Sequence, residues 1–278
     1  MNRTWSAQTL GLGLWLLASL AAYAQGLPKP FRLGIAPHTS TRVILEMYQP
    51  LRAHLERALG SAVEVQTAPD FTEFARRALN HEYDLVVTTG HQARLLQTDA
   101  QFLPLLTYKA DFKAVAIVFD KSSVKSARDL RGTTAIGLSV TSLVTLWGQH
   151  WLKVQGVAEV PVRYVSAADS VAQLLLAGEG SVGFVSLANY QKLPADVRGA
   201  LRLLAESPTM AGRVYVLDRS HAARKEPILK ALWGFADSEA GRHYFEVNKL
   251  DGYRLLRKRE LESMDPFAAE VRQTLRPK

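Results

Sequence analysis

The stretch Thr133–Leu152, TTAIGLSVTSLVTLWGQHWL, contains a short apolar segment, a hydroxyl-rich turn and an amphipathic segment with two tryptophans. We predict a strand over Thr133–Gly137 and a helix after the turn. Ser139, Thr141 and Ser142 lie in the turn, and Ser and Thr are favoured there because their oxygens satisfy free N–H groups at a helix start. The same N–H groups can bind an anion. A strand, a polar turn and a helix in this order are typical of an α/β fold.

The same unit recurs on both sides of this stretch. In the expected helix Thr41–Leu59 the apolar residues recur at steps of three and four, and Pro50 is expected to kink the helix or break it in two. Alternating strands and helices predict βαβ units and mostly parallel sheets. The other predicted strands are Phe31–Ala36, Val63–Thr67, Tyr83–Thr88, Phe112–Phe119, Val162–Val165, Ser181–Val185, Leu201–Ala205 and Arg213–Leu217. The other predicted helices are Phe71–Leu79, one after Gly90, Ser126–Leu130, Asp169–Ala177, Pro227–Asp237 and Glu239–Val247.

The first 24 residues have the layout of a secretory signal peptide. Arg3 is their only charge, an apolar run covers Leu10–Ala22, and Ala22-Tyr23-Ala24 has the form of a cleavage site. A membrane anchor needs about 20 apolar residues, which is more than this run supplies. We therefore expect an exported, soluble protein that begins near Gln25.

Composition excludes several classes of protein. The chain has no cysteine, which excludes disulfides, thiolate metal sites and a cysteine nucleophile. The net charge of +8 can attract nucleic acid or acidic membranes. However, the densest basic run, Arg254–Arg259, is followed by acids, and we predict that it is the solvated face of a C-terminal helix. No nucleic-acid partner is expected.

Motifs of common enzymes are not matched. Gly137–Thr141, GLSVT, lacks the final glycine of the Gly-x-Ser-x-Gly nucleophile turn. His81-Glu82 lacks the second histidine of a zinc-protease helix, and no phosphate-binding Gly-x-x-x-x-Gly-Lys-Ser/Thr loop occurs. We expect a binding protein that is not an enzyme and uses no cofactor or metal.

Five further segments occur in an order and spacing typical of one family. They are YQPLRAHLERALG (Tyr48–Gly60), VEVQTAPDFTEF (Val63–Phe74), AIVFDKSSVKSARDLRGTTAIG (Ala116–Gly137), VRYVSAADSVAQLLLAGEGSVGFVS (Val162–Ser186) and SPTMAGRVYVLDRS (Ser207–Ser220). Over about Phe31–Phe245 the chain resembles the periplasmic phosphate/phosphite/phosphonate-binding proteins, the phosphonate receptors of ABC importers.

The resemblance implies an α/β fold of the two-lobed periplasmic binding protein class, type II, that closes on a small oxyanion. The first lobe would hold residues 25–111 and 218–278, and the second residues 112–217, with the ligand cleft between them. The implied partner is an ABC permease, and the protein is expected to be a monomer. The alternative partner is a membrane sensor histidine kinase that reads ligand occupancy.

The resemblance also implies ligand-binding residues. Thr141 and Ser142 match the family's anion loop, with Val140 in place of its first hydroxyl and Ser139 beside it. Phe71 falls on a ligand-binding tyrosine. Thr88 or Thr89 falls near a second ligand-binding tyrosine of the family. Ala168 falls at about the position of the family's binding histidine. Ser181 and Ala188 fall at about the positions of the acids that hold an aminoalkyl group in other members.

Three hydroxyl-rich turns follow predicted strands, and they contain the candidate site residues. Each turn alone is also a common helix cap, but three in matching positions favour a shared anion cradle. His38 and His91 lie in two of these turns and could donate to an oxyanion, or ligate a metal if they converge. Aromatic residues at helical spacing, such as Tyr108, are expected in the core. The candidates in the turns are His38, Thr39, Ser40, Thr88, Thr89, His91, Ser139, Thr141 and Ser142.

Overall fold

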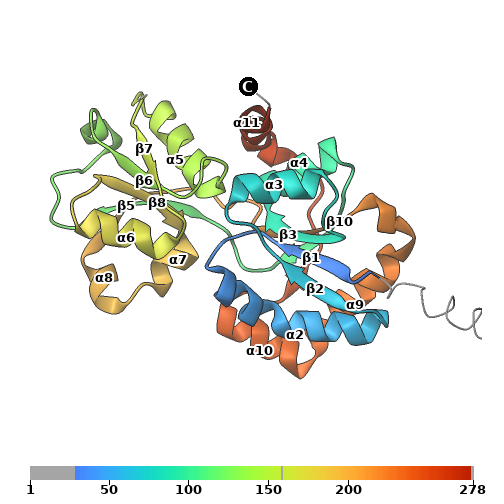
Figure 1. Ribbon diagram of the computed structural model, residues 1–278. Coiled ribbons are helices and arrows are strands. Elements are labelled where there is room, and N and C mark those ends of the chain that lie inside the picture. Colours follow the sequence, from blue (N-terminus) through green and yellow to red (C-terminus); the bar gives the residue numbers. More distant parts are fainter. Residues whose placement is uncertain (1–28, 158, 277–278) are drawn as a thin grey trace, which may run out of the picture. The chain divides into compact units, whose positions relative to one another are not determined.

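The computed structural model describes residues 29–157 and 159–276 and contains two β-sheets flanked by helices (Figure 1). The expected signal peptide, residues 1–24, lies outside the described residues. Among the described residues, no helix is long and apolar enough to cross a membrane.

The first sheet has six strands in the order β11-β4-β10-β3-β1-β2. β1 pairs in parallel with β2 and β3, whereas β10 pairs antiparallel with β3 and β4, and β11 pairs antiparallel with β4. The strands are β1 (Phe31–Ile35), β2 (Val63–Gln66), β3 (Leu85–Thr89), β4 (Leu103–Tyr108), β10 (Arg213–Leu217) and β11 (Tyr253–Arg254).

The second sheet has five strands in the order β7-β6-β8-β5-β9. β6 pairs in parallel with β7 and β8, and β5 pairs antiparallel with β8 and β9. The strands are β5 (Ala114–Phe119), β6 (Ala135–Gly137), β7 (Val162–Tyr164), β8 (Val182–Ser186) and β9 (Leu201–Glu206).

Both sheets are therefore mixed, although the alternation of strands and helices predicts mostly parallel ones. The difference arises where the chain passes between the sheets, from β4 to β5 and from β9 to β10. The strand that follows each connection, β5 or β10, pairs antiparallel with both of its neighbours. β10 belongs to the first sheet, whereas the expected boundary assigns residues up to Leu217 to the second lobe.

Helices cover both faces of each sheet (Figure 1). In the second sheet, a Cβ on Gly183 would lie 2.5 Å from Val171 of α6, while Gly148 of α5 lies against the ring of Phe184. Successive strand residues face opposite sides of a sheet, so α5 and α6 cover opposite faces. The helices are α2 (Thr41–Leu59), α3 (Phe71–Leu79), α4 (Gly90–Asp99), α5 (Leu143–Val154), α6 (Ala168–Leu176), α7 (Leu187–Lys192), α8 (Ala195–Gly199), α9 (Lys225–Asp237), α10 (Glu239–Asn248) and α11 (Asp265–Leu275). The short 3-10 helices are η1 (Ala127–Leu130), η2 (Arg219–Arg224) and η3 (Leu261–Met264).

Two local expectations need correction. Of the two outcomes expected at Pro50, a kink or a break, the break does not occur, because α2 is one helix of 19 residues. Proline leaves one carbonyl of the preceding turn unbonded, but that carbonyl belongs to exposed Glu46, where water can satisfy it. The basic run Arg254–Arg259 is not helical: it follows from β11 into a turn, in which Arg254 forms a bidentate pair with Glu260.

Candidate functional site

A pocket opens where several strands of the two sheets end. His38 follows β1, Thr89 ends β3, Leu138 follows β6 and Ser186 ends β8, and all four line the pocket. The carboxyl ends of strands are where open α/β sheets usually bind ligands. The position therefore fits a ligand site, and the side chains determine which ligand it suits.

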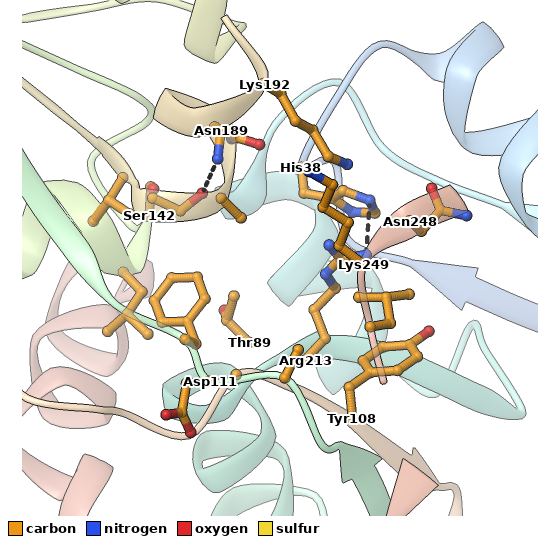
Figure 2. A pocket seen from close by; sticks show the side chains of 18 of the residues that line it. His38, Thr89, Tyr108, Asp111, Ser142, Asn189, Lys192, Arg213, Asn248 and Lys249 are labelled. Atoms are coloured by element: carbon orange, nitrogen blue, oxygen red, sulfur yellow. Dashed lines mark hydrogen bonds between the residues drawn. The ribbon is translucent and has the colours of Figure 1, made fainter. Parts of the chain in front are cut away.

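Four nitrogen-bearing side chains form what we call the cationic end of the pocket: His38, Lys192, Arg213 and Lys249 (Figure 2). They come from the turn after β1, the end of α7, the start of β10 and the residue after α10. Asp111 is the only carboxylate among the described lining residues, and its side chain points away from the cationic end (Figure 2). This end carries an excess of positive charge.

Arg213 is the most constrained of these groups. Its Nη1 lies 3.3 Å from His38 Nε2 and 3.5 Å from the Tyr48 hydroxyl. It forms no ion pair with any carboxylate that the structure describes. Burial opposes its charge, but the surrounding tyrosines outweigh burial and raise the pKa of Arg213 above its usual value. Arg213 is thus a charged, half-buried group with an unmatched charge.

The charge of Arg213 helps to lower the pKa values of its neighbours His38 and Lys192. The His38 Nδ1–H donates to the Ala36 carbonyl at 2.8 Å, so its Nε2 is free to accept from Arg213. Burial, followed by the charge of Arg213, lowers the pKa of His38 well below 6.5, and the ring is neutral. Burial and the charges of Arg213 and Lys249 also lower the pKa of Lys192. The positive charges of Arg213, Lys192 and Lys249 repel one another, and an anion between them would relieve that repulsion.

A buried tyrosine cluster, defined here as Tyr108, Tyr215, Tyr244 and Tyr253, supports Arg213. The guanidinium carbon of Arg213 lies 5.6 Å from the centre of the Tyr108 ring, within cation–π range. The Tyr108 hydroxyl bonds those of Tyr244 at 2.7 Å and Tyr215 at 2.8 Å, and Tyr215 bonds Tyr253 at 2.8 Å. Burial raises the pKa of each hydroxyl, so the cluster is a neutral platform under the cation.

The second polar region, which we call the helix end, is the start of α5. Ser142 is the N-cap residue, yet its side chain makes no cap hydrogen bond and has no hydrogen-bond partner among the described residues. It is only 2% exposed and lines the pocket together with Leu143 and Val144. The first N–H groups of a helix have no partner within it. The α5 start therefore presents N–H groups and one open hydroxyl to the pocket.

Thr141, the neighbour of Ser142, is used differently. Its side chain is fully buried, and its hydroxyl lies 3.1 Å from that of Thr72 on α3 and 3.4 Å from that of Ser139. Its carbonyl accepts from the His91 Nε2–H at 2.9 Å. Thr141 thus joins the turn before α5 to two helices of the first sheet and is not part of the pocket lining.

Both ring nitrogens of His91 form hydrogen bonds within the protein. Because Nε2–H donates to Thr141, Nδ1 accepts from the Thr89 hydroxyl at 3.0 Å. Burial lowers the pKa of His91 to about 4, although the Thr141 carbonyl opposes the shift. A neutral ring with both nitrogens bonded has no free position for a metal. Among the described residues, no three His, Cys, Asp or Glu side chains gather to hold one.

The structure brings only part of the expected site together. His38, Phe71, Thr89 and Ser142 line the pocket, whereas Thr39, Ser40, Thr88, His91, Ser139 and Thr141 do not. The Thr88 hydroxyl instead donates to Gln92 at 2.9 Å. The lining residues that sequence reasoning missed include Asn189, Lys192, Arg213 and Lys249, whereas Tyr108 was one of the aromatic residues considered for either the cleft or the core. The one available signal was Arg213 at the first position of a correctly predicted strand.

Comparison with known proteins agrees with this fold and pocket. Residues 33–261 match the family model described as the periplasmic substrate-binding protein of phosphonate ABC transporters, and the chain belongs to this family. No sequence among the curated proteins matches at a significant level.

Three solved structures illustrate the similarity of the fold. PhnD1 from Prochlorococcus marinus, solved with methylphosphonate, has a TM-score of 0.77 at 15% identity, covering 88% of this chain and 99% of its own. A Xanthomonas citri protein solved with ATP has a TM-score of 0.77 at 18% identity, covering 90% and 100%. A phosphonate-transporter component from Pseudomonas aeruginosa has a TM-score of 0.74 at 12% identity, covering 90% of each chain. The expected family and the type II two-lobed fold are confirmed.

Proposed function

We propose that the protein binds a phosphonate-class oxyanion between Arg213 and the start of α5 and presents it to the permease of an ABC importer. The observation that carries this proposal is the unmatched charge of Arg213, which shares one pocket with the open hydroxyl of Ser142. Guanidinium groups bind phosphorus oxyanions through paired, charge-assisted hydrogen bonds. Helix N-termini bind the same anions through backbone N–H groups.

Two further observations support the proposal. Family membership favours a transport role over the sensor-kinase alternative. A protein of similar fold was solved with methylphosphonate and another with ATP, and both ligands carry phosphorus oxyanion groups. Closure around a hinge is a common motion of such binding proteins, and the two direct connections between the sheets provide its natural position.

Isothermal titration of ligand-free protein with methylphosphonate, phosphite, phosphate and sulfate tests the proposal. At least one phosphorus oxyanion should bind to the wild-type protein, and Arg213→Gln should lose that binding. Retained folding of the variant is checked by circular dichroism. If none of the phosphorus compounds binds to the wild-type protein, the proposed function is wrong.

We also propose that residues 1–24 direct export and are removed, and that the mature protein acts as a monomer in the periplasm. Mass spectrometry of protein purified from a periplasmic fraction should give an N-terminus at Gln25. Light scattering should give the mass of one chain.

A further inference from the structure

We propose that the ligand carries a second anionic group, held by Lys192 and Lys249, so that the preferred class is a phosphonocarboxylate and not a simple alkyl- or aminoalkylphosphonate. The inference rests on the proposed function, because it assumes that the phosphonate group occupies the space between Arg213 and the start of α5. It concerns the rest of the molecule that bears the phosphonate.

Arg213 and the two lysines together carry three positive charges, whereas one phosphonate group carries at most two negative ones. Lys192 ends α7 and Lys249 follows α10, and both line the pocket on the side of Arg213 and His38 (Figure 2). Neither forms an ion pair with a carboxylate among the described residues. Both residues are largely exposed, but they come from separate elements to line one pocket with Arg213. An anionic group between them would relieve the repulsion of these three charges.

The backbone at Lys249 is a second observation. Lys249 closes α10 with φ of +52°, in the left-handed conformation that usually favours glycine or asparagine at this position. A lysine is less stable than glycine in this backbone conformation. Its placement in the pocket lining gives its side chain a use that glycine could not supply.

The pocket also has room and apolar surface for a carbon spacer. Its cavity volume is about 110 Å³, and a cavity needs only about 10–15 Å³ of this measure to hold one water molecule. Phe71, Phe112 and Leu143 contribute apolar lining. Ala188, which falls where the family resemblance places an acid that holds an ammonium group, also lines the pocket. An ammonium substituent would meet cations here and no facing carboxylate.

Three phosphonates of similar size separate the possibilities: phosphonoacetate, ethylphosphonate and 2-aminoethylphosphonate. Titrated at one pH and low salt, phosphonoacetate should bind at least tenfold more tightly than ethylphosphonate, because a hydrogen-bonded ion pair is gained. The ammonium compound should bind more weakly than ethylphosphonate. Equal affinity for phosphonoacetate and ethylphosphonate would overturn this inference while leaving the proposed function intact. If none of the three binds, the proposed function fails as well.

The double variant Lys192→Met/Lys249→Met identifies the residues responsible. It should reduce the preference for phosphonoacetate over ethylphosphonate to less than threefold. Both ligands lose the general attraction of the two charges, but only phosphonoacetate loses a hydrogen-bonded ion pair at its second group. Lys230→Met is the matched control, because Lys230 is an exposed lysine of α9 outside the pocket lining. A preference that persists in the folded double variant would show that these lysines do not hold the second group.

Discussion

The two ends of the pocket attract an anion by different physical means. At the cationic end the attraction comes from side-chain charges, and Arg213 is held in place by the tyrosine cluster beneath it. At the helix end it comes from neutral groups, the N–H groups of α5 and the Ser142 hydroxyl. A helix N-terminus acts like about half a unit of positive charge. The cationic end should therefore determine how strongly charged ligands bind, and the helix end how their oxygens are oriented.

The helix end contains its own contrast. Thr141 and Ser142 are adjacent and both carry hydroxyls, but Thr141 is bonded to Thr72 while Ser142 is open to the pocket. The Thr141 hydroxyl thus stabilises the structure, whereas the Ser142 hydroxyl remains available to a ligand.

The largest effect is expected at the cationic end. Arg213→Gln removes up to two charge-assisted hydrogen bonds, each worth about 1.5–3 kcal/mol, so methylphosphonate affinity should fall by roughly two orders of magnitude or more. Titration calorimetry measures this loss. Arg272→Gln, which breaks a pair with Asp99 outside the pocket, is the control and should leave affinity unchanged. An Arg213→Gln affinity within threefold of the wild type would refute the assigned role of the cationic end.

The burial of His91 should make stability depend on pH. The pKa of His91 is about 4 in the folded protein, against an ordinary value of about 6.5. Between these values the unfolded chain binds a proton that the folded protein does not, so stability is lost as pH falls. The full loss is about 3 kcal/mol.

Urea unfolding at several pH values between 7.5 and 4 tests this expectation. His91→Gln should be less stable than the wild type at pH 7.5 and should show a shallower decline, because other titrating groups remain. Parallel declines in the two proteins would contradict the shifted pKa.

Removing the hydroxyl of Ser142 should mainly change affinity, whereas removing that of Thr141 should mainly change stability. Ser142→Ala should weaken methylphosphonate binding by about tenfold with little change in melting temperature, since one hydrogen bond to a charged group is lost. Thr141→Val should instead cost about 1 kcal/mol of stability, the value of one internal hydrogen bond, with affinity nearly unchanged. The reverse result would place the ligand at Thr141 and not at Ser142.

The smallest effect is expected in the tyrosine cluster. Tyr253→Phe removes the hydroxyl that bonds Tyr215 and should lower the free energy of unfolding by about 0.5–1.5 kcal/mol. Affinity should change by less than twofold, because Tyr253 is not in the pocket lining. A clear loss of affinity would mean that the cluster controls the position of Arg213 more tightly than its contacts indicate.

Much of the fold could be predicted because its elements have strong local patterns. The bounds of α2 and α3 are as predicted, as is the strand Arg213–Leu217. Strand β4 (Leu103–Tyr108) had no predicted counterpart and contains Pro104, which lies where the pairing with β10 changes register. Proline is tolerated in a sheet at such irregularities, but the irregularity exists only once the two strands pair.

The sequence by itself determined the class of the protein: the alternation of strands and helices, the family, and hydroxyl-rich turns after strands, which bring Thr89 and Ser142 to the pocket. Only the tertiary structure decided which hydroxyls stay open, and it alone assembled the cationic end from residues 38, 192, 213 and 249. The reason is physical. Backbone periodicity and helix capping depend on residues a few positions apart, whereas an unmatched charge depends on pairing and burial between distant segments of the chain.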